Sequence, residues 1–307
     1  MRPIIAITGP TAVGKSAVAD HVALALGTDV LSADAMQVYK GMVIGTAKTP
    51  VSERLVPLRL IDIVDPSEPY SAALYQLHAR SEIARLDANG QPVVFCGGTG
   101  LYLRAALDHM VFPKGEVDDE RRATFLSLHK ELGDNGLHQI LAERDPASAA
   151  CIHPHNVKRV IRALEMHDEG VSYAEQSSGF SNPQQEYEYV IFALSMHRSR
   201  LYDRINARVD SMMRQGLLEE VAGLLESGAR DALTSRQAIG YKELIEYLDG
   251  SCSLEEAVDM IKQRSRRYAK RQLAWCRRDA RMEWLDIDVL GIEGAVEEIL
   301  SRVGLHE

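Results

Sequence analysis

The stretch Gly9-Pro-Thr-Ala-Val-Gly14-Lys15-Ser16 decides the fold of this chain. The apolar run 3–8 before it predicts a buried strand, and the Ala- and Leu-rich run 17–26 after it predicts a helix. A strand, a GxxxxGK(S/T) segment and a helix in this order form a P-loop. Its glycines let backbone N–H groups surround phosphate, its lysine reaches the outer oxygens, and its serine can ligate Mg²⁺. We therefore expect the chain to bind a di- or triphosphate.

The expected diphosphate site combines this loop with an arginine from later in the chain. Arg204 and Arg208 stand at i and i+4 of a predicted helix, a spacing at which two guanidinium groups can clamp phosphate. The residues assigned to the site are Gly9, Pro10, Thr11, Ala12, Val13, Gly14, Lys15, Ser16 and Arg208. Ser16 is also the expected metal ligand.

The composition of the chain restricts the class of protein to which it can belong. The 307 residues are 46% hydrophobic and 26% charged, typical of a soluble globular chain. No apolar run is long enough to span a bilayer, and the first predicted strand begins too early for a signal peptide. Four scattered cysteines indicate reduced thiols, so we expect a cytoplasmic protein without membrane contact. The net charge of −9 by itself argues against a nucleic-acid partner, although local basic patches can overrule it.

Apolar runs alternate with helical patterns through the first third of the chain. Strands are predicted at 3–8, 28–34, 58–65 and 92–98, and a further helix at 71–88 begins after the N-cap Ser71. This alternation predicts an α/β fold with a doubly wound parallel sheet.

The pattern then changes. No strand is predicted from 114 to 186, where helical stretches at 118–132, 136–144 and 156–168 indicate a small all-helical insertion. A fifth strand follows at 187–194, and then helices at 198–215, 217–227, 239–248 and 254–278. We therefore expect a P-loop NTPase-like core domain, residues 1–114 and 186–307, and a helical insertion domain, residues 115–185.

Asp34 and Thr99 are the candidate catalytic residues. Asp34 ends the second predicted strand, so it should lie beside the P-loop if the two strands are neighbours, where it could accept a proton from a nucleophile. The alternative is a water-mediated Mg²⁺ ligand or a helix cap. Gly97-Gly98 ends the fourth strand where hydrolytic P-loop proteins carry a carboxylate, which weakens an ATPase interpretation. These glycines predict a close approach to a second ligand, or a tight turn with Thr99 as N-cap.

Basic residues cluster despite the acidic total. Residues 264–281 hold eight Lys and Arg, and at helical spacing Arg267 and Arg271 share a stripe flanked by Tyr268 and Trp275. Positive stripes with aromatic residues suit a phosphate backbone with unstacked bases, whereas a solvated basic helix is the alternative. A second cluster, 158–162, lies in the insertion.

The sequence resembles the tRNA dimethylallyltransferases, also called tRNA isopentenyltransferases, over nearly its whole length. The matching stretches are GPTAVGKS (9–16), SADAMQVYKGMVIGTAK (32–48), GGTGLYLRA (97–105), HPHNVKRVIRALE (153–165), RLYDRINARVDSMMRQGLLEEV (200–221), SRQAIGYKEL (235–244) and YAKRQLAWCRR (268–278). The P-loop is common to many families, and the other stretches in this order are far more specific.

The resemblance implies a particular use of the P-loop. In this family it holds dimethylallyl diphosphate with Mg²⁺, and the acceptor is the exocyclic amine of the adenosine just 3′ of the anticodon, position 37, in tRNAs reading codons that begin with U. Asp34 matches the general base of the family, and Thr99 a residue near the reacting groups. The expected contacts with the tRNA anticodon stem-loop are Asp34, Ala35, Met36, Gln37, Gly100, Arg122, Lys158, Arg159, Val160, Ile161, Arg162, Ile239, Gly240, Tyr241, Lys242, Glu243 and Leu244, to which the basic helix adds Arg267 and Arg271.

One departure from the family pattern concerns an expected tRNA contact, and three alternative functions stay open. Ala35 stands where the family usually has serine, so a hydroxyl contact is missing. An adenylate isopentenyltransferase, a small-molecule P-loop kinase and a non-enzymatic nucleotide-dependent RNA-binding protein would share the P-loop. The basic helix and the insertion favour a large RNA acceptor, and we expect a monomer.

Overall fold

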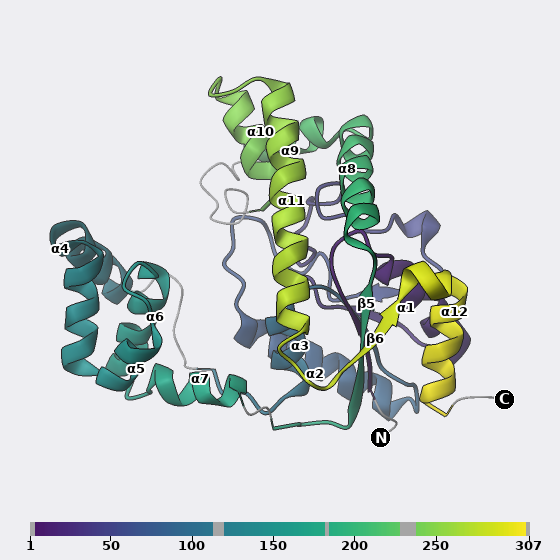
Figure 1. Cartoon of the computed structure of the whole chain (residues 1–307), viewed down its shortest axis with the longest axis horizontal. Helices are drawn as coiled ribbons and strands as arrows, with labels where there is room; N and C mark the ends of the chain where they lie inside the picture. The colour runs from purple at the N-terminus through teal and green to yellow at the C-terminus, as the bar shows by residue number, and fades with distance from the viewer. Residues whose placement is uncertain (1–3, 113–119, 182–183, 228–237, 305–307) are drawn as a thin grey trace. The chain divides into compact units, whose positions relative to one another are not determined.

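The computed structural model describes residues 4–112, 120–181, 184–227 and 238–304. These form two compact units: Met1–Leu107 together with Tyr187–Glu307, and Asp108–Glu186. Figure 1 shows the elements of both. The expected start of the insertion at 115 lies outside the described residues.

A six-stranded, all-parallel sheet forms the centre of the first unit, in the order β3-β2-β4-β1-β5-β6. The strands are β1 (Ile4–Thr8), β2 (Val30–Ser32), β3 (Leu58–Arg59), β4 (Val94–Cys96), β5 (Tyr189–Ser195) and β6 (Met282–Asp286). The predicted α/β fold with a parallel sheet is therefore confirmed.

Two details of the sheet differ from prediction. The third strand ends at Arg59 instead of 65, because Leu60 and Asp62 adopt left-handed backbone angles, φ 61° and 52°, that extended pairing does not allow. The sixth strand was not predicted. In β6 the two buried residues, Met282 and Leu285, are three positions apart and therefore break the alternation by which a strand is detected.

Helices pack around the sheet of this unit (Figure 1). They are α1 (Lys15–Leu26), the 3-10 turn η1 (Val51–Glu53), α2 (Ala72–Ala88), α3 (Gly100–Leu107), α8 (Arg198–Arg214), α9 (Leu217–Glu226), α10 (Tyr241–Leu248), α11 (Leu254–Cys276) and α12 (Ile287–Arg302). Ser71 caps α2 as predicted, because its side chain accepts from the Leu74 N–H. Helices α8 to α11 pack against one another in a bundle that includes the long α11 (Figure 1).

The main core lies between β1, β5 and the helices α1 and α12. Ile7 and Phe192 from adjacent strands meet Val18 of α1 and Ile299 of α12, and all four are fully buried. This packing holds the start of α1 rigidly against the end of β1, which is where the P-loop lies.

The second unit has a core of its own. Its helices are α4 (Glu120–Arg144), α5 (Pro146–Cys151), α6 (Val157–Asp168) and α7 (Tyr173–Ser181). Phe125 and Leu141 of α4 pack against Leu164 of α6. The two helices predicted at 118–132 and 136–144 are one element with a break at Gly133, whose φ of 69° interrupts the helix. Among its described residues this unit contains no strand beyond an isolated bridge from Asp108 to Gln185.

In the part of the chain that the structure describes, no helix has the length and apolar character needed to cross a membrane. All four cysteines are free, as predicted.

Candidate active site

The P-loop connects β1 to α1 and depends on two of its glycines. Gly9 has φ 137°, and a Cβ there would lie 2.6 Å from the carbonyl oxygen of Leu194 in β5. Gly14 has φ 112° and caps α1 in a left-handed conformation. Both positions exclude side chains, so the backbone can wrap tightly at the helix N-terminus where an anion is favoured.

Two cationic side chains lie at the P-loop, one from Lys15 of the loop itself and one from Arg208 of α8. Lys15 donates to the Pro10 carbonyl at 2.7 Å, and burial lowers the pKa of its amine to about 8, with Arg208 acting in the same direction. Burial also lowers the pKa of Arg208, whose Nη1 lies 3.5 Å from the Thr11 hydroxyl. Two desolvated positive charges side by side are costly without an anion, and their arrangement suits a bound diphosphate.

A cavity of about 420 Å³ joins these groups to the candidate catalytic residues. Lys15, Ser16, Asp34, Thr99 and Arg208 all line it. The expected neighbourhood of Asp34 and the P-loop is therefore found, but the reason given for it is wrong. Strand β4 lies between β1 and β2, so the two groups meet across one intervening strand end.

Asp34 and Thr99 are linked through the backbone between them. Asp34 Oδ1 accepts from the Met36 N–H at 2.9 Å, and Thr99 Oγ1 accepts from the Ala35 N–H at 3.0 Å. The Thr99 hydroxyl therefore reaches across to the 34–36 turn rather than serving only as a cap of α3. Asp34 keeps a second carboxylate oxygen for chemistry in the cavity.

The glycine turn after β4 packs closely against other parts of the protein, which favours the tight-turn alternative, and the second ligand contact stays a prediction. A Cβ on Gly97 would lie 2.2 Å from the Ala33 carbonyl oxygen, and one on Gly98 2.0 Å from Nε2 of Gln272. At Gly100 a Cβ would lie 2.1 Å from the Trp275 ring, so α11 passes close to this position, and the tRNA contact expected there stays a prediction. The missing side chains of Gly98 and Gly100 therefore let Gln272 and Trp275 of α11 approach the turn closely.

Gln272 and Tyr268 of α11 are site residues that sequence reasoning missed as such. Gln272 is 6% exposed, accepts from the Thr11 N–H at 2.8 Å and donates to the Gly98 carbonyl at 3.2 Å. Tyr268 lines the cavity, hydrogen-bonds Thr99 and Gln272, and has a phenol pKa raised by burial. The available signal was the spacing 269, 272, 276, which places a glutamine among buried residues.

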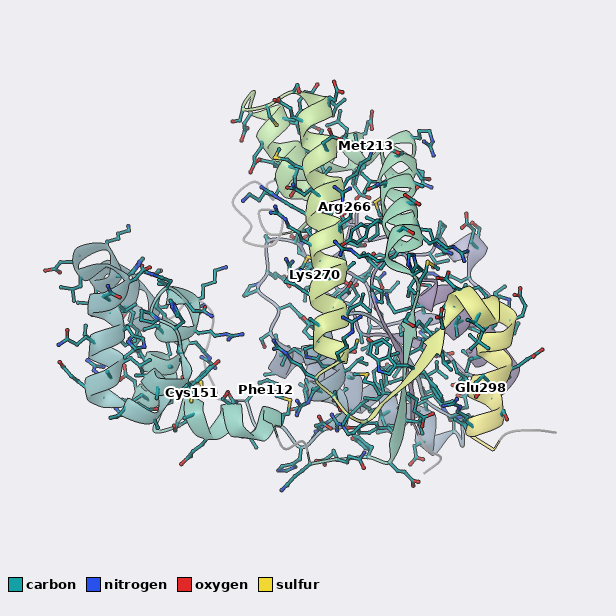
Figure 2. All side chains as sticks on the ribbon, viewed as in Figure 1. Phe112, Cys151, Met213, Arg266, Lys270 and Glu298 are labelled. Carbon is teal, nitrogen blue, oxygen red and sulfur yellow. The ribbon has the colours of Figure 1, made fainter. Side chains whose placement is uncertain are left out.

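Basic residues of α11 divide into structural and exposed groups. Arg264 pairs with the buried Glu243 of α10 at 2.5 Å, and Arg266 donates to Asn206 of α8 at 2.6 Å. Arg267, Lys270 and Arg271 are exposed, and Arg271 also stacks on Tyr268 with 5.5 Å to the ring centroid. Figure 2 labels Arg266 and Lys270 along this helix. The alternative of a solvated basic helix is therefore wrong for Arg264 and Arg266, which pair with other helices, and stays open for the exposed residues.

The 239–244 stretch presents few side chains to a partner. Ile239 and Gly240 line the cavity and Lys242 is exposed, whereas the side chains of Tyr241, Glu243 and Leu244 are buried. Residues 235–237 of the same family stretch lie outside the described residues.

The expected tRNA residues of the second unit also divide. Arg122 and Arg162 both pair with the buried carboxylate of Glu165, at 3.1 and 3.3 Å. Lys158 and Arg159 are exposed at the start of α6. The remaining two positions have side chains inside the core of this unit: Val160 and Ile161.

The oxygen donors around the cavity fit a hard cation. Ser16 is exposed at the P-loop, and Asp20 and Asp34 line the same cavity. Among the described residues no group of three or more His, Cys, Asp and Glu side chains could hold a metal by itself. Phosphate oxygens would therefore have to complete the shell of an ion bound here.

The chain matches two family models. Residues 37–279 match the IPP transferase model, and residues 2–65 match the isopentenyl transferase model. A tRNA dimethylallyltransferase of Carboxydothermus hydrogenoformans is 43% identical over 99% of this chain and 98% of its own. One from Geobacillus thermodenitrificans is 46% identical over 98% and 96%.

Solved structures give the same result. The tRNA isopentenylpyrophosphate transferase of Bacillus halodurans is 42% identical, covers 99% of this chain and 97% of its own, and superposes with a TM-score of 0.72. A eukaryotic dimethylallyltransferase, solved acting on tRNA, is 26% identical with a TM-score of 0.82, covering 98% of this chain and 80% of its own.

Proposed function

The chain belongs to the tRNA dimethylallyltransferase family, and from that premise we propose that it is an enzyme that transfers a dimethylallyl group from dimethylallyl diphosphate to tRNA. The acceptor in this proposal is the exocyclic amine of adenosine 37, beside the anticodon. The products are N6-(dimethylallyl)adenosine and diphosphate.

The observation that supports the reaction best is the shared cavity of Lys15, Ser16, Asp34, Thr99 and Arg208. A new carbon–nitrogen bond would form at the first carbon of the donor while its carbon–oxygen bond to diphosphate breaks. Asp34 would accept the proton that the amine loses, and the Thr99 hydroxyl would hold the 34–36 turn in place.

The reaction depends strongly on stabilisation of the diphosphate leaving group, because an aromatic amine is a weak nucleophile. Lys15, Arg208 and the P-loop N–H groups would balance the charge that accumulates on diphosphate. Ser16 would hold Mg²⁺, which supplies further neutralisation of that charge when bound. The desolvated cations described above suit this task.

A base within a folded tRNA loop must leave its stack to reach such a cavity. The exposed side chains of Arg267, Lys270 and Arg271 on α11, and of Lys158 and Arg159 on α6, would bind the RNA backbone. We propose that the protein works in the cytoplasm as a monomer.

Competition between acceptors tests the function. The protein is incubated with Mg²⁺, dimethylallyl diphosphate, unmodified tRNA and free AMP, and each acceptor is assayed for a five-carbon adduct. We expect the adduct on tRNA alone. An adduct on AMP alone would indicate an adenylate isopentenyltransferase. In a parallel incubation with ATP in place of dimethylallyl diphosphate, ATP consumption would indicate a kinase.

A further inference from the structure

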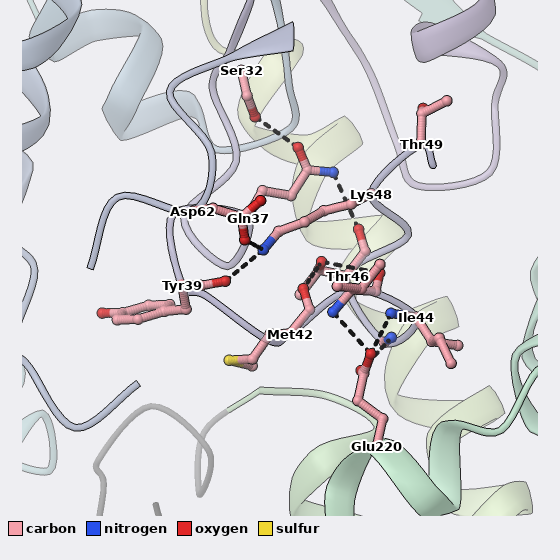
Figure 3. Close-up of polar contacts among 12 residues, drawn as sticks. Ser32, Gln37, Tyr39, Met42, Ile44, Thr46, Lys48, Thr49, Asp62 and Glu220 are labelled. Carbon is pink, nitrogen blue, oxygen red and sulfur yellow. Dashed lines mark hydrogen bonds and ion pairs between the residues drawn. The ribbon is translucent and has the colours of Figure 1, made fainter. Parts of the chain in front are cut away.

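Glu220 of α9 receives three consecutive backbone N–H groups from a loop far away in sequence. Its Oε2 accepts from Val43 at 3.0 Å and from Ile44 at 2.8 Å, and its Oε1 accepts from Gly45 at 3.2 Å. Figure 3 shows the carboxylate pointing into this turn. Charge-assisted bonds of this kind are stronger than neutral ones, so the turn is fixed to α9.

Tyr241 of α10 completes the arrangement. Its hydroxyl donates to Glu220 Oε1 at 2.6 Å, so four donors converge on one carboxylate. A Cβ on Gly45 would lie 2.4 Å from the Tyr241 ring, which shows how closely the ring covers the turn. Tyr241 therefore orients the carboxylate and covers the loop, although its own side chain is buried.

The loop held in this way forms part of the cavity wall. Gly45, Thr46 and Gln37 line the cavity, and the Thr46 carbonyl accepts from Gln37 Nε2 at 3.2 Å. Gln37 Oε1 accepts from the Ser32 hydroxyl at 2.7 Å (Figure 3). A continuous set of contacts thus runs from Glu220 to a residue three positions after Asp34.

On the far side the loop is anchored by a buried lysine. Lys48 is 4% exposed, donates to the Tyr39 carbonyl and pairs with Asp62 at 2.6 Å. With residues 43–45 bound to Glu220 and residue 48 bound to Asp62, the segment between them has little freedom.

We propose that Glu220 and Tyr241 are a positioning pair that fixes the 43–46 loop, and through it Gln37, for the acceptor base. This role rests on the proposed function and adds to it a part played by residues that do not face the acceptor themselves. If the pair has this role, a substitution in it lowers the rate of transfer to the acceptor and leaves diphosphate binding unchanged.

Two variants and two matched controls test the pair. Glu220→Gln leaves one carbonyl oxygen for four donors, and Tyr241→Phe removes one donor while keeping the ring on Gly45. Glu219→Gln changes an exposed neighbour on α9, and Tyr247→Phe removes a hydroxyl from the same helix as Tyr241. Hydrogen exchange measures the protection of the 43–45 amides. Single-turnover assays at saturating tRNA measure the transfer rate. Heat protection by inorganic pyrophosphate reports on the diphosphate site.

We expect faster amide exchange at 43–45 in both variants, and a single-turnover rate lowered about tenfold or more in Glu220→Gln, because small misplacements of reacting groups are costly. Pyrophosphate protection and both controls should match the unaltered protein. Unchanged exchange, an unchanged rate, or an equal loss of pyrophosphate protection would overturn the proposal. No adduct with the unaltered protein would overturn the proposed function, whereas full activity of Glu220→Gln would overturn only the role of the pair.

Discussion

Gln272 and Thr11, 261 positions apart in the chain, are joined by a hydrogen bond of 2.8 Å from the Thr11 backbone N–H to Gln272 Oε1. The same side-chain amide donates to the Gly98 carbonyl, one residue before Thr99. One buried side chain of α11 therefore ties the diphosphate loop to the turn that carries a candidate catalytic residue. The P-loop side of the cavity and the Thr99 side of the cavity are therefore both supported by Gln272.

Removing that amide should loosen both sides at once. Gln272→Ala leaves the Thr11 N–H and the Gly98 carbonyl without this partner, which we expect to lower the free energy of unfolding by about 1–3 kcal/mol. Thermal unfolding with and without pyrophosphate measures stability and diphosphate affinity together. Gln263→Ala, an exposed glutamine on the same helix, is the control. A Gln272→Ala protein as stable and as well protected as the control would contradict the bridging role.

Asp34 should matter for the chemical step more than for tRNA binding. Asp34→Asn keeps an oxygen for the Met36 N–H but cannot accept a proton, so we expect a single-turnover rate about 10²-fold lower with little change in tRNA affinity. Rapid-quench assays and a direct binding titration measure the two quantities. Asp65→Asn, an exposed carboxylate on the following loop, should leave both unchanged. Equal losses of rate and affinity in Asp34→Asn would exclude the general-base role.

Lys15 should make diphosphate binding depend on pH. Because its folded-state pKa is about 8, the charge that attracts diphosphate is lost as pH rises through 8. Affinity for pyrophosphate should then fall by up to about tenfold per pH unit. Over the same range the unfolded chain still holds the lysine proton, so this group makes the ligand-free protein more stable as pH rises toward its ordinary pKa. Calorimetric titrations from pH 7 to 9.5 measure the affinity, and a flat profile would contradict the assignment.

Asp20 should destabilise the protein without ligand. Its carboxyl lines the cavity and its pKa is raised chiefly by burial, against smaller opposing effects of His21 and Arg54. A raised carboxyl pKa means that ionisation costs more in the folded state, so Asp20→Asn should raise the melting temperature at pH 7. The gain should shrink as pH falls below the carboxyl pKa. The control Asp203→Asn, on the exposed surface of α8, should show no gain at either pH.

Gly100 and Gly223 should respond in opposite ways to alanine. A Cβ at Gly100 would overlap the Trp275 ring, so Gly100→Ala should cost about 1–3 kcal/mol of stability. Gly223 is an exposed helical position of α9 with open space around its missing Cβ, so alanine there should add about 0.5–1 kcal/mol. Denaturant unfolding of the two variants measures both. Tolerance at Gly100 would show that α11 does not approach the turn as closely as described.

Local patterns explain what could be predicted from sequence. The P-loop, its flanking strand and helix, and the Ser71 cap depend on neighbouring residues, so their signals are complete within a short window. Strand order and the reach of α11 depend on contacts across the whole chain. The proximity of Asp34 to the P-loop is therefore predicted correctly, but from a wrong assumption about neighbouring strands. The close approach of α11 to Gly98 and Gly100 leaves no signal in the sequence near these glycines.

Two supporting residues were not predicted from the sequence for the same reason, although the position of each in its helix indicates a buried polar side chain. Gln272 lies between buried residues of α11 at helical spacing, and Glu220 stands three positions after the buried Leu217 and beside the buried Val221. A polar side chain on the apolar face of a helix must find a partner. Sequence shows that need, but the partners, Thr11 and the 43–45 turn, appear only in the folded chain.

Position-resolved mass spectrometry can detect dimethylallyl transfer to adenosine 37 of tRNA without relying on any variant. Unmodified tRNA is incubated with the protein, Mg²⁺ and dimethylallyl diphosphate, digested, and its anticodon-loop fragments are sequenced by mass. We predict a single five-carbon adduct on the adenosine that follows the anticodon, and its loss when adenosine 37 is replaced by guanosine. An unmodified loop, or an adduct at another position, would rule out the proposed reaction.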